Sequence, residues 1–190
     1  MTPSLAPLRA PLRCHPATPA GVALAVSAEV HPRAEGLHLS YMLRGDIAAL
    51  CIPSPAAPVA TDGLWQHTCF EAFVAVDGEA AYQEFNFSPS SAWAAYRFCA
   101  ERARDAVAEG QRPVRLPAPQ VSVTSEALTL TTRVPASALP LSPAVLSIGL
   151  SAVIEERSGR LSYWALHHPG TRPDFHHADG RTLRMAAPLI

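Results

Sequence analysis

Hydrophobic and polar residues alternate with a period of two along most of this chain. In the segment LHLSYMLR, the side chains of Leu37, Leu39, Tyr41 and Leu43 fall on one face, and the positions between them fall on the other. Successive side chains of a β-strand point to opposite faces, so this alternation predicts a strand with one buried face. Similar patterns predict strands in VALAVSAEV, CFEAFVAV, YQEFNFS, AWAAYRF, VSVTSEALTLTTRV, VLSIGLSAVIEE and LSYWALH.

Turn-forming residues separate the predicted strands. Gly, Pro, Ser and Asp occur in PRAEG, VDGEAA, SPSS and RSGR, and these residues favour the backbone conformations of tight turns. The residues around Ser158 and Gly159 predict an antiparallel hairpin between 154–157 and 161–167. Many short strands with close turns predict an all-β fold with little helix: an antiparallel β-sandwich of two packed sheets, of the immunoglobulin or jelly-roll kind.

Three segments depart from the strand pattern. The Pro-rich residues 51–63 predict a surface loop, because loops carry backbone polar groups that need solvent. The segment VPASALPLSP could hold one helical turn. Residues 99–113 contain good helix formers followed by Gly110, but they have no wide hydrophobic stripe, so a short helix and an irregular loop both remain open.

Length, composition and charge narrow the class of protein. The chain has 190 residues, 48% hydrophobic and 16% charged, which predicts a single domain over residues 1–190 with a substantial core. The formal net charge of −1 provides no basic surface for nucleic acid or anionic lipid, so we expect neither a nucleic-acid nor a membrane partner. All basic side chains besides histidine are arginine, which excludes lysine-based covalent catalysis.

The cysteines and the N-terminal residues bear on location. Cys14, Cys51, Cys69 and Cys99 are widely spaced and form no C-x-x-C pair, so the pattern gives no sign of a zinc or redox site. No charged-then-apolar leader is visible, and the longest apolar stretch is too short to span a bilayer. These features predict a cytoplasmic protein with free, mostly buried thiols.

Polar residues on three of the predicted strands suggest a binding face. In CFEAFVAV, Glu71 points away from its hydrophobic neighbours, and in YQEFNFS, Glu84 and Asn86 do the same. If these strands lie beside AWAAYRF, then Glu71, Glu84, Asn86 and Arg97 can converge on one face. Carboxylate, amide and guanidinium groups suit the hydroxyl groups of a sugar.

Two tryptophans flank this predicted face. Trp65 and Trp164 could stack on the C–H faces of a sugar ring. The alternative is that they belong to the hydrophobic core, which the pattern favours for Trp164 and leaves open for Trp65.

The same segments carry a family resemblance. LWQHTCFEAF, YQEFNFSP with WAAYRF, and YWALHHP with PDFHH resemble the DOMON-like domains related to family 9 carbohydrate-binding modules. YMLRGDIAAL and VPASAL extend the resemblance along the chain. It implies a β-sandwich of two antiparallel sheets, with a ligand site on one sheet or at its edge that binds a sugar or heme.

The resemblance also implies roles for individual residues. Trp65 and Glu71 match a tryptophan and a strand glutamate of the sugar-binding modules by their interval. Arg97 resembles the sugar-contacting arginine at a different spacing. Trp164 and Phe175 are both candidates for the second stacking ring.

Two histidine pairs lie in YWALHHPGTRPDFHH. Adjacent residues such as His167 and His168 point to opposite faces when extended, so neither pair can chelate one ion by itself. One histidine from each pair, with Asp174, could still hold a divalent metal, and heme is a further alternative. The pattern favours imidazoles at a pocket rim, with His168 as a candidate, or a structural role in fixing the loop.

These observations predict a non-catalytic domain that binds a saccharide or a similar polyhydroxy small molecule, without a cofactor. The main alternative is a heme- or metal-binding domain using His167–His177. A small glycoside hydrolase using Glu71 and Glu84 is a third hypothesis, because such enzymes place two carboxyl groups around the scissile bond. No G-x-S-x-G, phosphate loop, H-E-x-x-H or dinucleotide fingerprint is present, so we assign no catalytic residue and no metal ligand.

Overall fold

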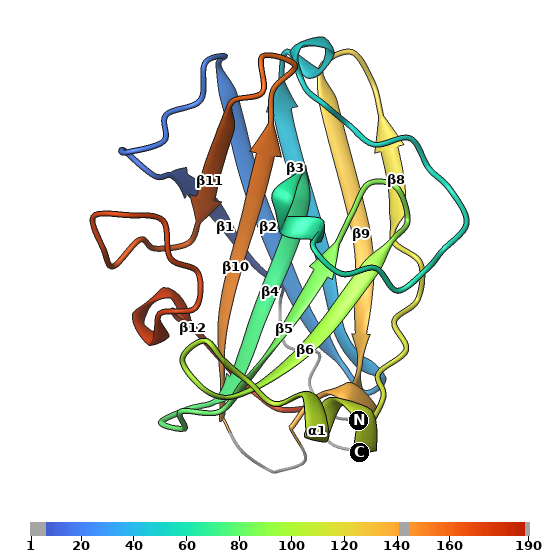
Figure 1. The fold of residues 1–190 in the computed structure, drawn as a ribbon, viewed down its shortest axis with the longest axis vertical. Coiled ribbons are helices and arrows are strands. Elements are labelled where there is room, and N and C mark those ends of the chain that lie inside the picture. The colour runs from blue at the N-terminus through green and yellow to red at the C-terminus, as the bar shows by residue number, and fades with distance from the viewer. Residues whose placement is uncertain (1–6, 141–144, 189–190) are drawn as a thin grey trace.

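Two antiparallel β-sheets pack face to face in the computed structural model, which describes residues 7–140 and 145–188 (Figure 1). The strands are β1 (Leu8–Cys14), β2 (Leu24–Arg33), β3 (Gly36–Gly45), β4 (Cys69–Val76), β5 (Tyr82–Phe87), β6 (Trp93–Ala100), β7 (Ala103–Arg104), β8 (Gln120–Val123), β9 (Ala127–Pro135), β10 (Val145–Glu155), β11 (Leu161–Ala165) and β12 (Leu183–Ala186). The predicted all-β antiparallel sandwich is therefore confirmed.

The strand order runs β7-β6-β5-β4-β10-β11-β1-β2-β3-β9-β8, and β12 pairs with β10. The first sheet holds β4 to β7 with β10, β11 and β12, and the second holds β1 to β3 with β8 and β9. A short antiparallel pairing of β1 with β11, at Arg13 and Cys14, connects the two sheets along one edge. In Figure 1 the first sheet faces the viewer and the second lies behind it.

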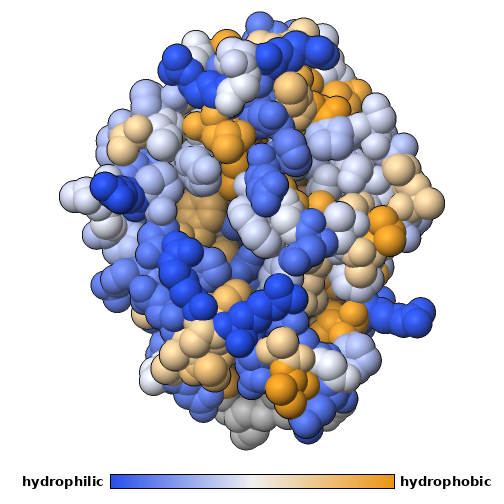
Figure 2. Space-filling model, in the orientation of Figure 1, coloured by the Kyte–Doolittle hydropathy of each residue, from blue (hydrophilic) through white to orange (hydrophobic). Residues whose placement is uncertain are grey.

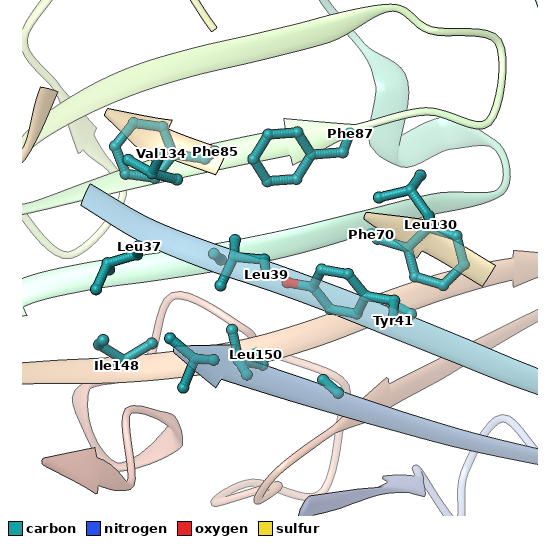
Figure 3. Close-up of a cluster of buried hydrophobic side chains, with 14 of the residues drawn as sticks. Leu37, Leu39, Tyr41, Phe70, Phe85, Phe87, Leu130, Val134, Ile148 and Leu150 are labelled. Atoms are coloured by element: carbon teal, nitrogen blue, oxygen red, sulfur yellow. The ribbon is translucent and has the colours of Figure 1, made fainter. Parts of the chain in front are cut away.

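The space between the sheets is filled by the hydrophobic faces of the predicted strands. Leu37, Leu39, Tyr41 and Leu43 of β3 are all buried, as their alternation predicted. They meet the inward-facing residues of the first sheet, which include Phe70, Phe85, Phe87, Ile148 and Leu150 (Figure 3). Burial of such side chains contributes roughly 1.5 to 3 kcal/mol each, so this core holds the two sheets together.

Most strand boundaries follow the sequence patterns, but three strands were missed. β1 contains Pro11, and β7 and β12 are short, so none of them shows a clear alternation. The predicted strand over 121–134 is divided into β8 and β9 by a turn in which Thr124 N–H donates to Ala127 O. The predicted hairpin after β10 is present, and Gly159 takes the left-handed φ of +82° that its turn requires.

Helices are short in the described residues. The helix α1 (Ala106–Gln111) begins at Asp105, whose side chain accepts a hydrogen bond from Ala108 N–H. Single 3₁₀ turns are η1 (Ile47–Ala49), η2 (Leu64–Gln66), η3 (Ala136–Ala138) and η4 (Ala178–Gly180). The helical turn predicted in VPASALPLSP is η3, while residues 141–144 of that segment lie outside the described residues. None of the helices in 7–140 and 145–188 has the length and hydrophobicity needed to cross a bilayer.

The cysteines were predicted to be free and mostly buried, and only the first part of this prediction agrees with the structure. All four are free thiols. The expectation that most are buried is wrong: only Cys69 is buried, Cys14 and Cys51 are partly exposed, and Cys99 is exposed. Cys69 lies inside a strand covered on both faces, whereas Cys99 lies near the end of β6, where the pairing with the two-residue edge strand β7 is irregular.

Candidate functional site

A cavity of about 350 Å³ opens on the outer face of the first sheet. The core fills the inner face of β4, so the alternate residues Glu71 and Phe73 point outward into this cavity. In Figure 1 the turn η2 lies over the sheet on one side, and the connection from β11 to β12 lies on the other. Figure 2 shows this face hollowed, with hydrophobic atoms at depth and hydrophilic residues around them.

The residues lining the cavity combine aromatic rings with charged groups. They are Trp65, Glu71, Phe73, Glu84, Tyr96, Phe98, Arg102, Arg104, Val153, Tyr163, Pro173, Phe175 and His176. Four of them were candidates from the sequence: Trp65, Glu71, Glu84 and Phe175. The structure brings these four together from β4, β5, η2 and the β11–β12 connection.

Glu71 lies at the bottom of the cavity and is only 2% exposed. Its Oε2 accepts a hydrogen bond from Ser151 Oγ at 3.3 Å, while its buried Oε1 has no hydrogen-bond partner among the described residues. Burial holds the pKa of the Glu71 carboxyl well above its usual range, and the nearby Glu84 raises it further. An unpaired buried oxygen of this kind is costly, which points to a role in binding.

Glu84 is the second carboxyl group in the cavity. Its Oε1 accepts a hydrogen bond from Asn86 Nδ2 at 2.8 Å. Burial raises the pKa of Glu84 to about 7, against the opposing effects of the Asn86 hydrogen bond and of Arg102 and Arg104. Asn86 is fully buried beside the carboxyl groups and does not line the cavity, so its place in the structure is to hold Glu84.

Aromatic rings form the walls of the cavity. The ring of Trp65, which is 41% exposed, meets the edge of Tyr96 at 5.9 Å between centroids. The ring centroid of Phe175 lies 6.4 Å from that of Phe73 and 6.0 Å from that of Tyr163. Rings carried by η2, β6 and the β11–β12 connection therefore surround the two carboxyl groups, and this combination of apolar faces with few polar groups is common in small-molecule sites.

His176 lines the cavity, whereas the sequence suggested it only as one member of a histidine pair that could hold a metal. Its Nδ1 is 2.7 Å from the hydroxyl of Tyr82, and its Nε2 is 3.8 Å from Glu84 Oε2. Burial lowers the pKa of His176 to about 4, helped by the charge of Arg102. The neutral imidazole accepts from the Tyr82 hydroxyl at Nδ1, which leaves Nε2–H directed towards Glu84.

Arg102 and Arg104 supply the positive charge of the cavity. Arg102 pairs with Asp174 at 2.8 Å, and Arg104 pairs with Glu109 at 2.9 Å. Arg102 has a left-handed φ of +55°, which is unusual for a residue with a Cβ, and its N–H donates to the Tyr82 hydroxyl. Arg102 lies in the turn between β6 and β7, and Arg104 lies on the two-residue β7, so no periodic pattern marks the direction of either side chain.

The expected convergence of Arg97 with the carboxyl groups is wrong. Arg97 is the register partner of Gln83, whereas Glu84 pairs with Tyr96. Directly opposed residues of two strands share a face, so Tyr96 points into the cavity and Arg97 points to the inner side of the sheet.

Trp164 also lies away from the cavity. It is 7% exposed within the core between the sheets, and its Nε1–H donates to Ser162 Oγ at 3.0 Å. Of the two candidates for a second stacking ring, only Phe175 lines the cavity.

The histidine-rich segment does not assemble the metal site considered above. His168 is outside the cavity lining, and its Nε2 lies 2.8 Å from Arg13 O. Asp174 is engaged with Arg102 and with His176 N–H. Within 7–140 and 145–188, no group of three or more His, Cys, Asp or Glu residues is arranged to hold a metal ion. His168 thus has the loop-fixing contact that was the alternative to a pocket rim.

Comparisons with known proteins give a structural likeness only. No protein-family model matches the chain, and no curated protein matches it. A crystal structure described as "a putative carbohydrate-binding protein from Bacteroides uniformis ATCC 8492" is similar, with a TM-score of 0.66 and 15% identity over 90% of this chain and 83% of that chain.

Two structures of a family 9 carbohydrate-binding module from Caldicellulosiruptor kristjanssonii are also similar. The complex with cellotriose has a TM-score of 0.50 and 10% identity, over 82% of this chain and 71% of that chain. The complex with glucose has a TM-score of 0.51 and 10% identity, over 82% and 73%. The chain therefore shares its fold with carbohydrate-binding proteins.

Proposed function

We propose that this chain is a non-catalytic binding domain for a saccharide or a similar polyhydroxy small molecule, held in the outer-face cavity. One observation supports this most directly: aromatic walls surround the buried Glu71, whose Oε1 has no protein partner in the described residues. A ligand hydroxyl can donate to that oxygen, and the rings can cover the apolar face of a sugar.

Different residues of the cavity can make the apolar and the polar contacts with such a ligand. Trp65 lies on η2 and Phe175 lies on the β11–β12 connection rather than on strands, and both rings can contact the C–H groups of a sugar ring. Glu71 and Glu84 accept from hydroxyl groups, and the guanidinium of Arg102 donates to hydroxyl oxygens. Each of these groups lines the same cavity.

The structural neighbours suggest which ligands to test first. Their structures contain cellotriose and glucose, and the shared fold makes these sugars a reasonable start for a wider panel of mono- and oligosaccharides. The relationship to DOMON-like domains in particular stays a prediction.

Isothermal titration of the full chain with this panel tests the proposal. We expect at least one saccharide to bind, with an affinity that falls about tenfold or more in Trp65→Ala and Phe175→Ala, since an aromatic contact and its buried area contribute on the order of 1 to 3 kcal/mol. Val123→Ala, at an exposed position on β8, is the matched control and should bind normally. Failure of every saccharide at millimolar concentration would reject the proposal.

The same samples separate binding from hydrolysis. Glu71 and Glu84 line one cavity, so the two-carboxylate chemistry of a glycosidase needs its own measurement. Chromatography of oligosaccharides incubated with the protein should show them intact. Turnover that disappears in Glu84→Gln would instead establish an enzyme.

A further inference from the structure

A second cavity, of about 340 Å³, lies on the other face of the β5–β6 hairpin. It is bounded by residues 60–62, by the end of α1 and by the segment that follows it. Gln83 of β5 and Arg97 of β6, which are register partners, both line it, as does Trp93. Arg97, which the sequence pattern predicted at the sugar site, therefore lines this second cavity instead.

Arg97 carries a positive charge on the inner side of the sheet without a counterion. In the described part of the chain its guanidinium makes no hydrogen bond or ion pair, and its Nε is buried. The backbone of Arg97 is engaged instead: its N–H donates to Glu109 Oε1 at 2.9 Å, and its carbonyl accepts from Asp105 N–H at 2.7 Å. A partly buried charge without a partner is costly to the fold, so an anion that entered the cavity would gain an unused donor fork.

Gln83 presents a second unused group to the same cavity. The residue is 6% exposed, and its buried Oε1 has no hydrogen-bond partner among the residues described. Amide and guanidinium therefore offer complementary groups side by side: Arg97 can only donate, while Gln83 Oε1 can only accept.

The acidic residues around the cavity are already paired elsewhere. Glu109 binds the guanidinium of Arg104 through both carboxylate oxygens, and Asp62 accepts from the Tyr96 hydroxyl at 2.5 Å and lies 3.8 Å from Arg104. The lining thus contains Arg97, Arg104 and Arg112 against Asp62 and Glu109, which leaves an excess of positive charge.

We propose that this second cavity binds a small hydroxycarboxylate, with the carboxylate on the Arg97 guanidinium and a neighbouring hydroxyl donating to Gln83 Oε1. The planar fork of arginine matches the two oxygens of a carboxylate. Trp93 and Val114 supply an apolar wall for the carbon chain, and the exposed Arg112 lies at the lining's solvent side. A neutral sugar would leave the charge of Arg97 uncompensated, so it fits this cavity less well.

Titration calorimetry with D-gluconate at about 0.15 M salt tests the assignment, with D-glucose as the uncharged counterpart. The full chain carrying Trp65→Ala is used alongside the unmodified chain, because this change impairs the first cavity and leaves the second intact. We expect gluconate to bind both proteins equally. We expect Arg97→Gln and Gln83→Leu each to weaken gluconate binding by about tenfold or more, the usual consequence of losing a hydrogen bond to a charged group.

Arg9→Gln, on β1 of the other sheet, controls for a general change in charge and should leave gluconate binding unchanged. Arg97→Gln removes an uncompensated charge, so its thermal unfolding temperature should not fall, which separates lost binding from lost folding. The proposal is overturned if gluconate fails to bind at millimolar concentration, if Arg97→Gln binds it as well as Arg9→Gln does, or if Trp65→Ala abolishes the binding.

Discussion

Glu71 of β4 and Asn86 of β5 are register partners, and each leaves one buried side-chain oxygen without a hydrogen bond in the described structure. The two oxygens are Glu71 Oε1 and Asn86 Oδ1. A folded chain rarely leaves buried oxygens unpaired on two directly opposed residues. Glu71 lines the aromatic cavity, so its unpaired oxygen indicates that stability is given up there for a site that can receive a donor from a ligand.

Replacing Glu71 with Gln should raise the stability of the fold and weaken the binding of the ligand. The change removes a buried carboxyl whose pKa is raised, and it introduces an NH₂ group that can donate to Asn86 Oδ1. We expect the free energy of unfolding at pH 8 to increase by about 1 to 3 kcal/mol, while the affinity for the bound saccharide falls about tenfold. Urea unfolding and calorimetry measure the two effects. Loss of stability together with loss of binding would contradict this interpretation.

Strand patterns were enough to predict the sandwich and the outer polar face. Glu71 and Glu84 alternate with core residues, so the packing that fixes β3 against β4 and β5 also fixes their direction. The same alternation puts Arg97 and Tyr96 on opposite faces of β6. Which of the two faces carries Glu84 depends on the strand register, and the β5–β6 turn sets the register that makes Tyr96 the partner of Glu84. A shift of one residue changes the face, and the sequence pattern alone left that register open.

The remainder of the site comes from segments without a period. Arg102 and His176 reach the cavity from the turn after β6 and from the β11–β12 connection. Their positions depend on individual contacts, such as the Tyr82 hydroxyl with His176. Such long-range pairs are not encoded in local alternation, so neither residue could be selected from the sequence. Trp164 was assigned to both the site and the core, and its burial decides for the core.

The raised pKa of Glu84 should make stability depend on pH. Burial raises this pKa to about 7, above the value near 4.3 of an unfolded chain, so the folded state favours the protonated form. The stabilisation is complete below about pH 4 and is lost as the pH rises through 7. Glu84→Gln should therefore gain stability relative to the unmodified chain over this range, by about 4 kcal/mol at most.

His176 acts in the opposite direction and must be separated from this effect. Its pKa is lowered to about 4, so its contribution is present above the unfolded value near 6.5 and is lost as the pH falls towards 4. Urea unfolding of the unmodified chain, Glu84→Gln and His176→Asn from pH 4 to pH 8 distinguishes the two. A difference between Glu84→Gln and the unmodified chain that does not change with pH would refute the assignment to Glu84.

The two tryptophans near the predicted face should respond differently to truncation. Trp164 is buried in the core, so Trp164→Ala should lower the free energy of unfolding by about 3 to 5 kcal/mol. Trp65 is 41% exposed, so Trp65→Ala should change it by less than about 1 kcal/mol and affect binding instead. Thermal unfolding and calorimetry on both variants check this. Equal destabilisation by the two changes would mean that Trp65 has a structural role.

The Tyr82 hydroxyl joins strand β5 to the turn between β6 and β7 and to the β11–β12 connection. It lies 2.7 Å from His176 Nδ1 and accepts from Arg102 N–H at 3.1 Å. Tyr82→Phe keeps the ring, which stacks on Phe98, but removes both hydrogen bonds. We expect a loss of about 1 to 2 kcal/mol and faster amide exchange at Arg102 and His176. Unchanged exchange at both positions would show that other contacts fix these segments.

A single hydroxyl connects the bottom of the cavity to the opposite sheet. Tyr41 of β3 crosses the core (Figure 3) and donates to the backbone carbonyl of Glu71 at 2.7 Å. Both residues are buried, so this hydrogen bond is shielded from water. It fixes the backbone of β4 at Glu71, the residue that carries the cavity carboxyl group. Tyr41→Phe should lower the free energy of unfolding by about 1 to 2 kcal/mol and weaken saccharide binding by a smaller factor than Glu71→Gln does.

Tyr163→Phe provides the matched control for this link. Tyr163 lines the cavity, and in the described part of the chain its hydroxyl makes no hydrogen bond, so its removal should cost less than about 0.5 kcal/mol. Urea unfolding compares the two variants under one condition. If Tyr41→Phe is no more destabilising than Tyr163→Phe, the hydroxyl does not anchor Glu71. If it is clearly more destabilising, the position of the binding carboxyl depends on a residue in the opposite sheet.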